Sequence, residues 1–445
     1  MNNSQRQSNR GRIKRAMRVA ALVSAVLLAA AAAAHIWMDR RYSRELERHI
    51  RQLERQGIPV TAQQLAGDPL PEDRNGATAV LQALPPAGPE AVPDLEAVIE
   101  RILTTPGTRP AGEDIQEVRR LLTGELSPTM RQLHRAAALT EARYPLAPGS
   151  LDVDGRTAAR ATLAVRLLAA EGVVRHAAGD SQGAAASFEA ALRIARCLRI
   201  QKDRSCWTAA WPAVNLALAG IQTAHTIRPL DADETARLDR VLASLDWMAG
   251  SRNVLDAHTV AVVSEARSWR SERSARGVLW RPYAAGMHLR LLELLETARR
   301  LADEPWRDWP AEARNPVRTN WLAPGRALVE IMRPAVTGPF WQRDAIIACC
   351  NAMRLSLALE AHRRRKGEYP RTLDALQMPA GGSVPPDPFS GEPFRYARTR
   401  NGYLFYSIGP DLRDDQGRTR KKTKQHTEEG DLLWDARSWL PRQPE

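Results

Sequence analysis

Residues 367–376 have the sequence GEYPRTLDAL, and residues 387–411 have the sequence DPFSGEPFRYARTRNGYLFYSIGPD. Both stretches are rich in Gly, Pro, Asp and Asn, which favour turns, and in aromatic residues, which favour strands. They predict a compact β module near the C-terminus. The rest of the chain has the patterns of helices and of the segments that connect them.

The predicted module contains a small antiparallel sheet. Two strands are expected at residues 394–398 and 403–408, joined by a turn through Asn401 and Gly402. Residues 431–434 add a candidate third strand.

A long helix is predicted just before these strands, at residues 343–366. Four cations at residues 363–366 suit the negative end of a helix dipole, and Gly367 follows at the position where a helix usually ends. Its apolar stripe consists of Ile346, Cys350, Met353, Leu357 and Ala361.

The order of these motifs resembles the globular part of the type II secretion major pseudopilins, over about residues 343–434. The resemblance implies a helix packed on a small antiparallel sheet. It also implies a calcium-binding loop in which Asp411 closes an S-x-G-x-D motif and Asp431 precedes the last strand. The chain as a whole resembles large membrane-anchored bacterial proteins that end in such a module.

Two features depart from the pseudopilin pattern. The sequence Arg-Ala-Met-Arg stands before the N-terminal apolar run, in place of a prepilin-peptidase site. The predicted calcium loop is also basic, which weakens a cation site and leaves an ordinary turn-forming role open for its acidic residues. The loop carries Arg418, Arg420, Lys421, Lys422 and Lys424.

The N-terminus predicts a membrane anchor. Residues 1–18 hold six cations and no acid, and residues 19–38 are apolar except for Ser24 and His35. A helix of this length measures about 30 Å, the thickness of a hydrocarbon core. A cleaved signal peptide is the competing interpretation, because residues 29–34 supply A-x-A sites; the apolar residues that continue to Met38 favour the uncleaved anchor.

Orientation follows from the short basic tail, because long domains translocate with little regard to their charge. We therefore expect residues 1–18 in the cytoplasm, residues 19–38 in the bacterial inner membrane as a single span, and residues 39–445 on the periplasmic or extracytoplasmic side.

The predicted fold class is mainly α. A helical domain is expected at residues 39–302, a Pro- and Trp-rich connector at 303–341, and the pseudopilin-like α+β module at 342–445. Within the helical domain, residues 158–178 and 182–199 indicate an antiparallel hairpin, which also resembles one tetratricopeptide-type unit. The connector contains Trp306, Trp309, Trp321 and Trp341, which we expect to hold it on the helical core.

Charge and cysteine content exclude some function classes. The formal net charge is +13, but the basic residues are dispersed among 51 acids along the whole chain, which predicts a solvated surface and no nucleic-acid partner. Four cysteines in 445 residues form no disulfide framework. Core thiols are favoured over a bridge between Cys197 and Cys206.

The sequence contains no metalloprotease, P-loop or dinucleotide-binding motif. One G-x-S-x-G string occurs at residues 179–183, but a helical pattern precedes it where a nucleophile elbow needs a strand. We therefore expect a turn in which Ser181 caps a helix. The histidines His258 and His288 have nearby glutamates, but neither pair has a third partner in the pattern.

Two functions of different classes fit these patterns. The first is a non-enzymatic envelope protein that presents the module to protein partners, linked to a secretion or pilus-like apparatus. The second is an envelope hydrolase or polymer-binding enzyme with a site near Trp269, Trp280 and His288. The lack of a catalytic motif favours the first. No cofactor other than calcium is expected, and no particular small-molecule ligand is indicated.

Overall fold

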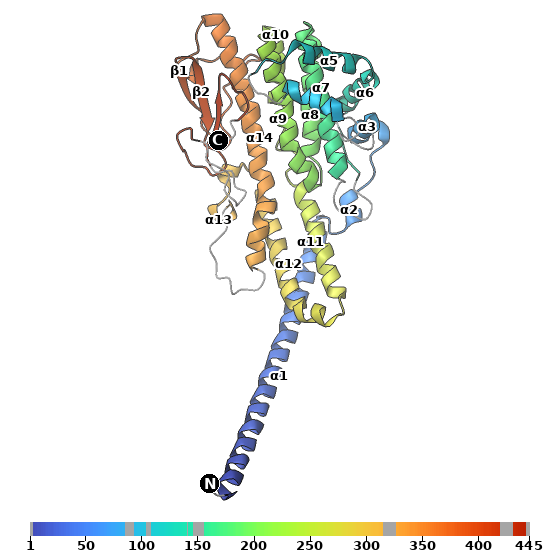
Figure 1. Ribbon diagram of the computed structural model, residues 1–445, viewed down its shortest axis with the longest axis vertical. Coiled ribbons are helices and arrows are strands. Elements are labelled where there is room, and N and C mark those ends of the chain that lie inside the picture. Colours follow the sequence, from blue (N-terminus) through green and yellow to red (C-terminus); the bar gives the residue numbers. More distant parts are fainter. Residues whose placement is uncertain are drawn as a thin grey trace. The chain divides into compact units, whose positions relative to one another are not determined.

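The computed structural model describes residues 3–84, 93–103, 108–139, 141–145, 155–314, 326–418 and 430–441. The chain is mainly helical and ends in a small antiparallel sheet, which confirms the predicted fold class (Figure 1). The helices are α1 (Asn3–Arg55), α2 (Ala62–Ala66), α3 (Gly76–Ala83), α4 (Pro93–Leu103), α5 (Gly112–Thr123), α6 (Ser127–Ala138), α7 (Gly155–Ala177), α8 (Ser181–Arg199), α9 (Arg204–Ile227), α10 (Ala232–Ser244), α11 (Asn253–Ser271), α12 (Ala275–Leu301), α13 (Ala311–Arg314) and α14 (Arg326–Lys366).

The chain divides into two compact units. The smaller unit contains Met1–Thr61, Thr259–Leu294 and Arg318–Met332, and the larger unit contains the remaining segments, Ala62–His258, Leu295–Val317 and Arg333–Glu445. The boundaries between the units fall inside α11, α12 and α14.

In the smaller unit, α1 contains the predicted apolar span. The apolar part of this helix, within Met17–Arg55, has a mean hydropathy of 2.3 and is 0% buried. Its later turns pack on α11 and α12 through Leu46 and Ile50, which are buried. Arg270 of α11 pairs with Glu47 of α1. Among the described residues, one helix is therefore long and apolar enough to cross a membrane, and its most apolar window is not buried against the rest of the protein.

The core of the larger unit is formed by α7, α8 and α9, and the predicted hairpin at residues 158–199 is confirmed. Phe188 of α8 is fully buried between two glycines, Gly172 of α7 and Gly220 of α9. A Cβ at Gly172 would lie 2.4 Å from the Phe188 ring, and one at Gly220 would lie 3.0 Å from it. The small residues at these two positions are what lets the three helices approach so closely.

The sheet has the strand order β1 (Arg395–Thr399), β2 (Gly402–Ser407) and β3 (Leu432–Asp435), with both pairs antiparallel. All three predicted strands are present within one residue of their expected bounds. Phe405 stacks on Trp434 with ring centroids 5.6 Å apart. The sheet region is tied to α14, since Asn351 donates to the Pro386 carbonyl at 3.0 Å and Tyr369 donates to Glu360. Gly367 ends α14 with a φ of 79°, as predicted.

Helices α9 and α14 continue through interior prolines, and in α14 these prolines lie where the sequence predicts a connector. Pro212 lies in the interior of α9, and Pro334 and Pro339 lie inside α14, which begins at Arg326 although the predicted helix begins at 343. Each interior proline costs roughly 3 kcal/mol because a backbone hydrogen bond is lost. Buried neighbours such as Trp207 in α9 and Phe340 in α14 supply the packing that offsets this cost.

The four cysteines are free, as expected for core thiols. Cys206, Cys349 and Cys350 are buried, and Cys197 is half-buried.

We expect Gly172→Ala to destabilise the larger unit by about 1–3 kcal/mol, because its methyl group must displace the Phe188 ring in a close-packed core. The matched control is Gly112→Ala at the start of α5, where a Cβ meets nothing within 4 Å. Denaturant unfolding of the detergent-solubilised protein measures both. Equal effects of the two substitutions would contradict this account of the core.

Candidate functional site

The two predicted calcium ligands lie at the ends of the loop between β2 and β3. Asp411 accepts backbone hydrogen bonds from Arg413 and Gly430, both at 3.2 Å. Asp431 accepts from Asp415 at 3.2 Å and from Gly417 at 2.6 Å. The structure thus places both carboxylates in the same loop, where their oxygens hold its backbone in place.

The ligand geometry of a calcium site is incomplete in the described part of this loop. Burial raises the pKa of both Asp411 and Asp431, and the negative charge of Asp415 raises each further. Calcium takes six to eight oxygen ligands. The described part of the chain contains no group of three or more acidic, His or Cys side chains placed to hold a metal. Residues 419–429, which carry most of the loop's cations, lie outside the described residues, so the calcium site stays a prediction.

The G-x-S-x-G string follows helix α7 directly, as the sequence predicts. The helix cap, however, is Asp180, whose side chain accepts from the Gly183 amide at 2.9 Å; the assignment of this role to Ser181 is wrong. Ser181 instead donates to Asp231 at 3.0 Å and accepts from Arg228 at 2.9 Å. Its hydroxyl therefore joins the start of α8 to the segment between α9 and α10.

A histidine and a glutamate that the sequence does not single out lie in the same network. His176 Nδ1 lies 2.7 Å from Glu234 Oε1, and His176 Nε2 lies 3.1 Å from the Arg228 carbonyl oxygen. The His176 side chain is fully buried. Its two ring nitrogens thus face acceptors other than Ser181, so the serine, histidine and carboxylate do not form a proton relay.

The Glu234 carboxylate is stabilised by this network. Burial alone would raise its pKa, but hydrogen bonds from His176 and from the Asp231 backbone outweigh that effect and lower the pKa to about 2. Asp231 and Glu234 also form a reciprocal capping box at the start of α10, with Asp231 as the cap. The network joins α7, α8 and α10 through charges that are buried and paired.

A second serine, histidine and glutamate meet between α6, α7 and α8. Glu171 lies 2.6 Å from His134 and accepts from Ser187 at 2.8 Å. Arg175 pairs with the other oxygen of this carboxylate at 2.8 Å. Since the histidine and the serine both bind the glutamate and not one another, the geometry suits helix packing and does not activate the serine as a nucleophile.

Two arginines and one aspartate form the most deeply buried ionic cluster. Arg343 donates to the carbonyls of Ala302 at 2.6 Å and Glu304 at 2.7 Å, and pairs with Asp344 at 2.6 Å. Asp344 also accepts from the Trp306 amide at 2.6 Å. Burial raises the pKa of Asp344, although Arg343 opposes that shift.

The second arginine of the cluster is stabilised by an aromatic ring. The Arg199 guanidinium carbon lies 3.1 Å from the centroid of the Trp207 ring. Its Nη2 donates to Ser251 at 3.5 Å, and Arg343 contacts the same hydroxyl at 3.4 Å. Burial lowers the pKa of Arg199, and the charge of Arg343 lowers it further. The negative charge of Asp344 thus balances two buried guanidinium groups, those of Arg343 and Arg199.

Among the described tryptophans of the predicted connector, Trp306 and Trp309 lie against α14, as expected for a segment held on the helical core. Trp306 and Trp309 are buried, and Trp306 donates to the Pro410 carbonyl at 2.8 Å. Trp309 packs on Phe340 with ring centroids 4.8 Å apart. Trp341 is half-buried in α14, and Trp321 lies outside the described residues.

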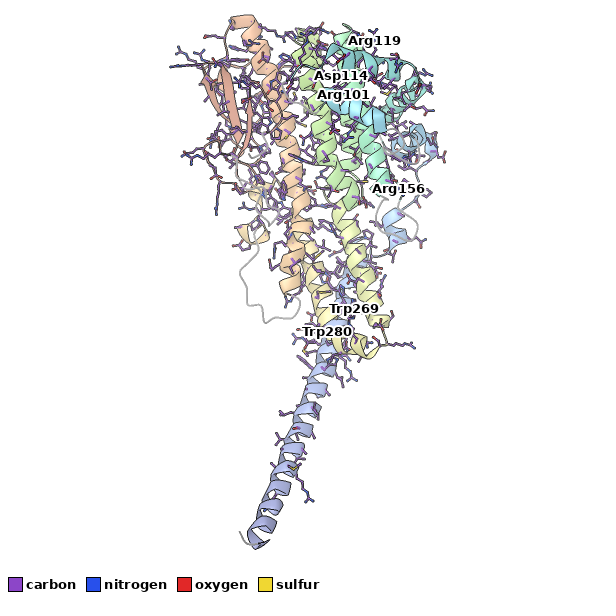
Figure 2. All side chains as sticks on the ribbon, in the orientation of Figure 1. Arg101, Asp114, Arg119, Arg156, Trp269 and Trp280 are labelled. Atoms are coloured by element: carbon purple, nitrogen blue, oxygen red, sulfur yellow. The ribbon has the colours of Figure 1, made fainter. Side chains whose placement is uncertain are left out.

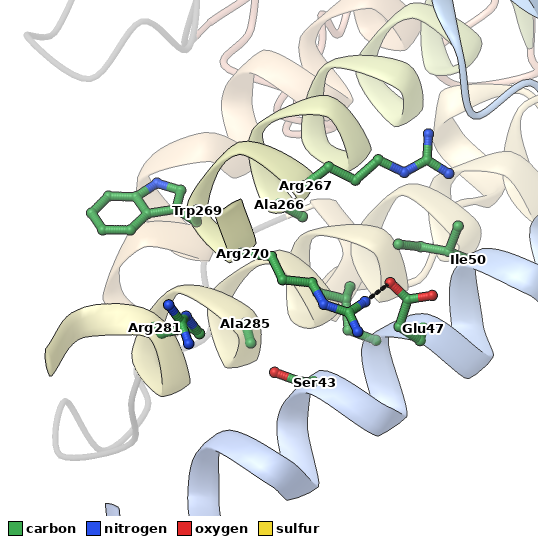
Figure 3. Close-up of a pocket in the computed structure, with 10 residues that line it drawn as sticks. Ser43, Glu47, Ile50, Ala266, Arg267, Trp269, Arg270, Arg281 and Ala285 are labelled. Carbon is green, nitrogen blue, oxygen red and sulfur yellow. Dashed lines mark hydrogen bonds and ion pairs between the residues drawn. The ribbon is translucent and has the colours of Figure 1, made fainter. Parts of the chain in front are cut away.

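A pocket lies beside Trp269, one of the three residues near which the sequence places a candidate enzyme site, and that site stays a prediction (Figure 3). The pocket there has a volume of about 20 Å³, which is room for about one water molecule. Trp269 lines it, but Trp280 and His288 do not. The lining residues are Ser43, Leu46, Glu47, Ile50, Ala266, Arg267, Trp269, Arg270, Arg281 and Ala285.

No family model matches the chain, and neither the curated proteins nor the solved structures contain a match.

We expect protein stability to fall as the pH falls from about 4.5 toward 2, in part through Glu234. Its folded pKa of about 2 lies below the ordinary value of 4.5, so the ionised carboxylate stabilises the fold at higher pH and this contribution is lost on acidification. Glu234→Gln should flatten the pH dependence in this window. Unfolding midpoints at a series of pH values measure the effect. His176→Asn should flatten it as well, and an unchanged slope in both variants would contradict the assignment.

We expect Asp344→Asn to destabilise the protein by roughly 3–5 kcal/mol, because it leaves two buried guanidinium groups without a negative partner. The control is Asp303→Asn, which removes an exposed pair with Arg252 and should change stability by less than about 1 kcal/mol. Chemical denaturation compares the two. A loss no larger than that of the control would show that Asp344 does not balance the cluster.

Proposed function

We propose that this protein is a single-pass anchored protein of the bacterial inner membrane. Its basic tail lies in the cytoplasm, and the bulk of the chain lies on the periplasmic or extracytoplasmic side. Its role there is structural: it presents a folded surface to other envelope proteins of a secretion or pilus-like apparatus.

The observation that carries this proposal is the apolar part of α1. It is hydrophobic enough to span a bilayer, and none of it is buried against the rest of the protein. A core helix of a soluble domain would be covered by its neighbours, whereas this one exposes large side chains such as Leu22, Val26 and Leu28 at 60% or more. Lipid is the environment that such a surface fits.

The buried polar networks support a role in binding and not in catalysis. The serines, histidines and acids that lie close together in the larger unit form hydrogen bonds with helix ends and with one another. The described pocket in the smaller unit holds about one water molecule. These groups stabilise a rigid helical support.

The β1 strand is the surface we assign to the protein partner. It pairs with β2 on one side only, and all its residues except Tyr396 are exposed. An open strand edge offers backbone groups to an incoming chain, and Arg395 and Arg398 on this strand discourage unselective pairing. The resemblance of this region to the pseudopilins supports an envelope protein as the partner.

A photo-crosslinking amino acid at Ala397 of β1 tests the proposal in intact cells. We expect it to yield a crosslinked product with a discrete envelope protein. The matched control places the same group at the exposed Arg119 of α5 (Figure 2), which should not give that product. No product at Ala397, or the same products at both positions, would count against a partner-binding role for this strand.

A further inference from the structure

Residues 272–283, which connect α11 to α12 and include the first turns of α12, are here called the α11–α12 turn. This segment exposes apolar side chains that a water-soluble surface would not. Val278, Leu279, Trp280 and Tyr283 are 47%, 60%, 52% and 40% exposed. Among the described residues, every other exposed large apolar side chain except Ile331 belongs to α1. The exposed apolar surface is therefore concentrated in two places, the apolar span and this turn.

Contacts within the smaller unit fix the level of the turn along α1. His35 Nε2 lies 3.1 Å from the Val278 carbonyl oxygen. The Tyr42 ring packs on Gly286, where a Cβ would lie 3.7 Å from it. The offset between the two helices is 243 residues at the first contact (278 − 35) and 244 at the second (286 − 42), so α12 runs parallel to α1 and in step with it.

This register places the exposed aromatics of the turn at the end of the apolar span. An offset of 243 brings Trp280 level with Trp37, and Tyr283 level with Arg40. Figure 2 shows Trp280 at the end of the hairpin, beside α1. Trp and Tyr are enriched at the level of lipid headgroups, where the ring is half in hydrocarbon and its polar edge is wet.

Cations outnumber acids beside the turn, where the acids are Glu272 and Asp39, so the net charge has the sign that anionic lipid headgroups attract. Arg273 and Arg276 are exposed in the turn, and Arg40 and Arg41 follow the apolar span in α1. A long arginine side chain can lie along an apolar surface while its guanidinium reaches a phosphate. The exposed aromatic side chains and the arginines lie at the same level along α1, which favours a membrane surface over a protein partner.

We propose that the α11–α12 turn, residues 272–283, is a second membrane contact of this protein. Leu279 and Trp280 enter the headgroup region of the bilayer that α1 spans, and Arg273 and Arg276 bind anionic lipid headgroups. This inference rests on the proposed membrane anchor, and its test separates the two.

The experiment uses the full chain in lipid nanodiscs with a fluorophore on a single introduced cysteine. The half-buried Cys197 is replaced by Ser, because the other three native thiols are buried. The probe is placed at Leu279→Cys in the turn, at Leu28→Cys in the apolar span, or at Gln52→Cys in α1 beyond the turn; all three positions are exposed. Lipids with a nitroxide near the headgroup or deep in the acyl chain serve as quenchers.

We expect the headgroup-level nitroxide to quench the probe at Leu279→Cys and the deep nitroxide to quench the probe at Leu28→Cys, with no quenching at Gln52→Cys. Phosphatidylglycerol in place of phosphatidylcholine should strengthen quenching at Leu279→Cys, and Arg273→Gln with Arg276→Gln should remove that lipid dependence.

If Leu28→Cys is quenched while Leu279→Cys behaves like Gln52→Cys, the second contact is overturned and the anchor stands. If Leu28→Cys is not quenched, the anchor itself is overturned. Quenching at Leu279→Cys that is the same in both lipids and unaffected by the arginine substitutions overturns the headgroup-binding part.

Discussion

The larger unit depends on one buried side chain, Arg343. Its guanidinium donates hydrogen bonds to the carbonyls of Ala302 and Glu304, just after the end of α12. The adjacent Asp344 accepts a hydrogen bond from the amide of Trp306. A buried charge of this kind is tolerated only while its hydrogen-bond partners remain in place. The end of α12, the Trp306 segment and α14 therefore cannot separate in this region without exposing or orphaning a charge. A single side chain thus couples segments that are some 40 residues apart in sequence.

Other polar contacts tie the C-terminal sheet region to the helical core. Asp239 of α10 is fully buried and accepts from Arg354 of α14 and from the Ala380 amide. Gln222 of α9 bonds to the backbone of both Arg437 and Trp439, beyond the last strand. The module that the sequence marks off by its composition is hydrogen-bonded to the helical core, so the surface that we propose for a partner belongs to a rigid support.

Local patterns predicted most of the fold. Strand alternation, the turn before Gly402 and the glycine that ends α14 are each determined by residues close in sequence, and all were found. The interior prolines of α14 were misleading because their local cost is outweighed by packing against distant parts of the chain. The ionic networks could not be predicted for the same reason: His176 and Glu234 are 58 residues apart, and nothing in either local pattern indicates their contact. The Asp231–Glu234 capping box was the one local signal near them. Of the candidate site, Asp411 and Asp431 were singled out through the resemblance to the pseudopilins, and the structure places them in the same loop. That the oxygens of both carboxylates accept hydrogen bonds from backbone amides could not be predicted from the sequence.

The register between α1 and α12 also constrains how the smaller unit stands on a membrane. Because the offset stays within one residue over two contacts, the hairpin axis runs along α1 and does not cross it. Each residue of helix adds about 1.5 Å, so Glu54, which pairs with Arg267 of α11, lies about 26 Å beyond Trp37. A single span can rotate and tilt freely, but a span with a second contact at its membrane exit has one preferred face toward the lipid. On this proposal the turn sets the orientation in which the anchored protein meets its partners.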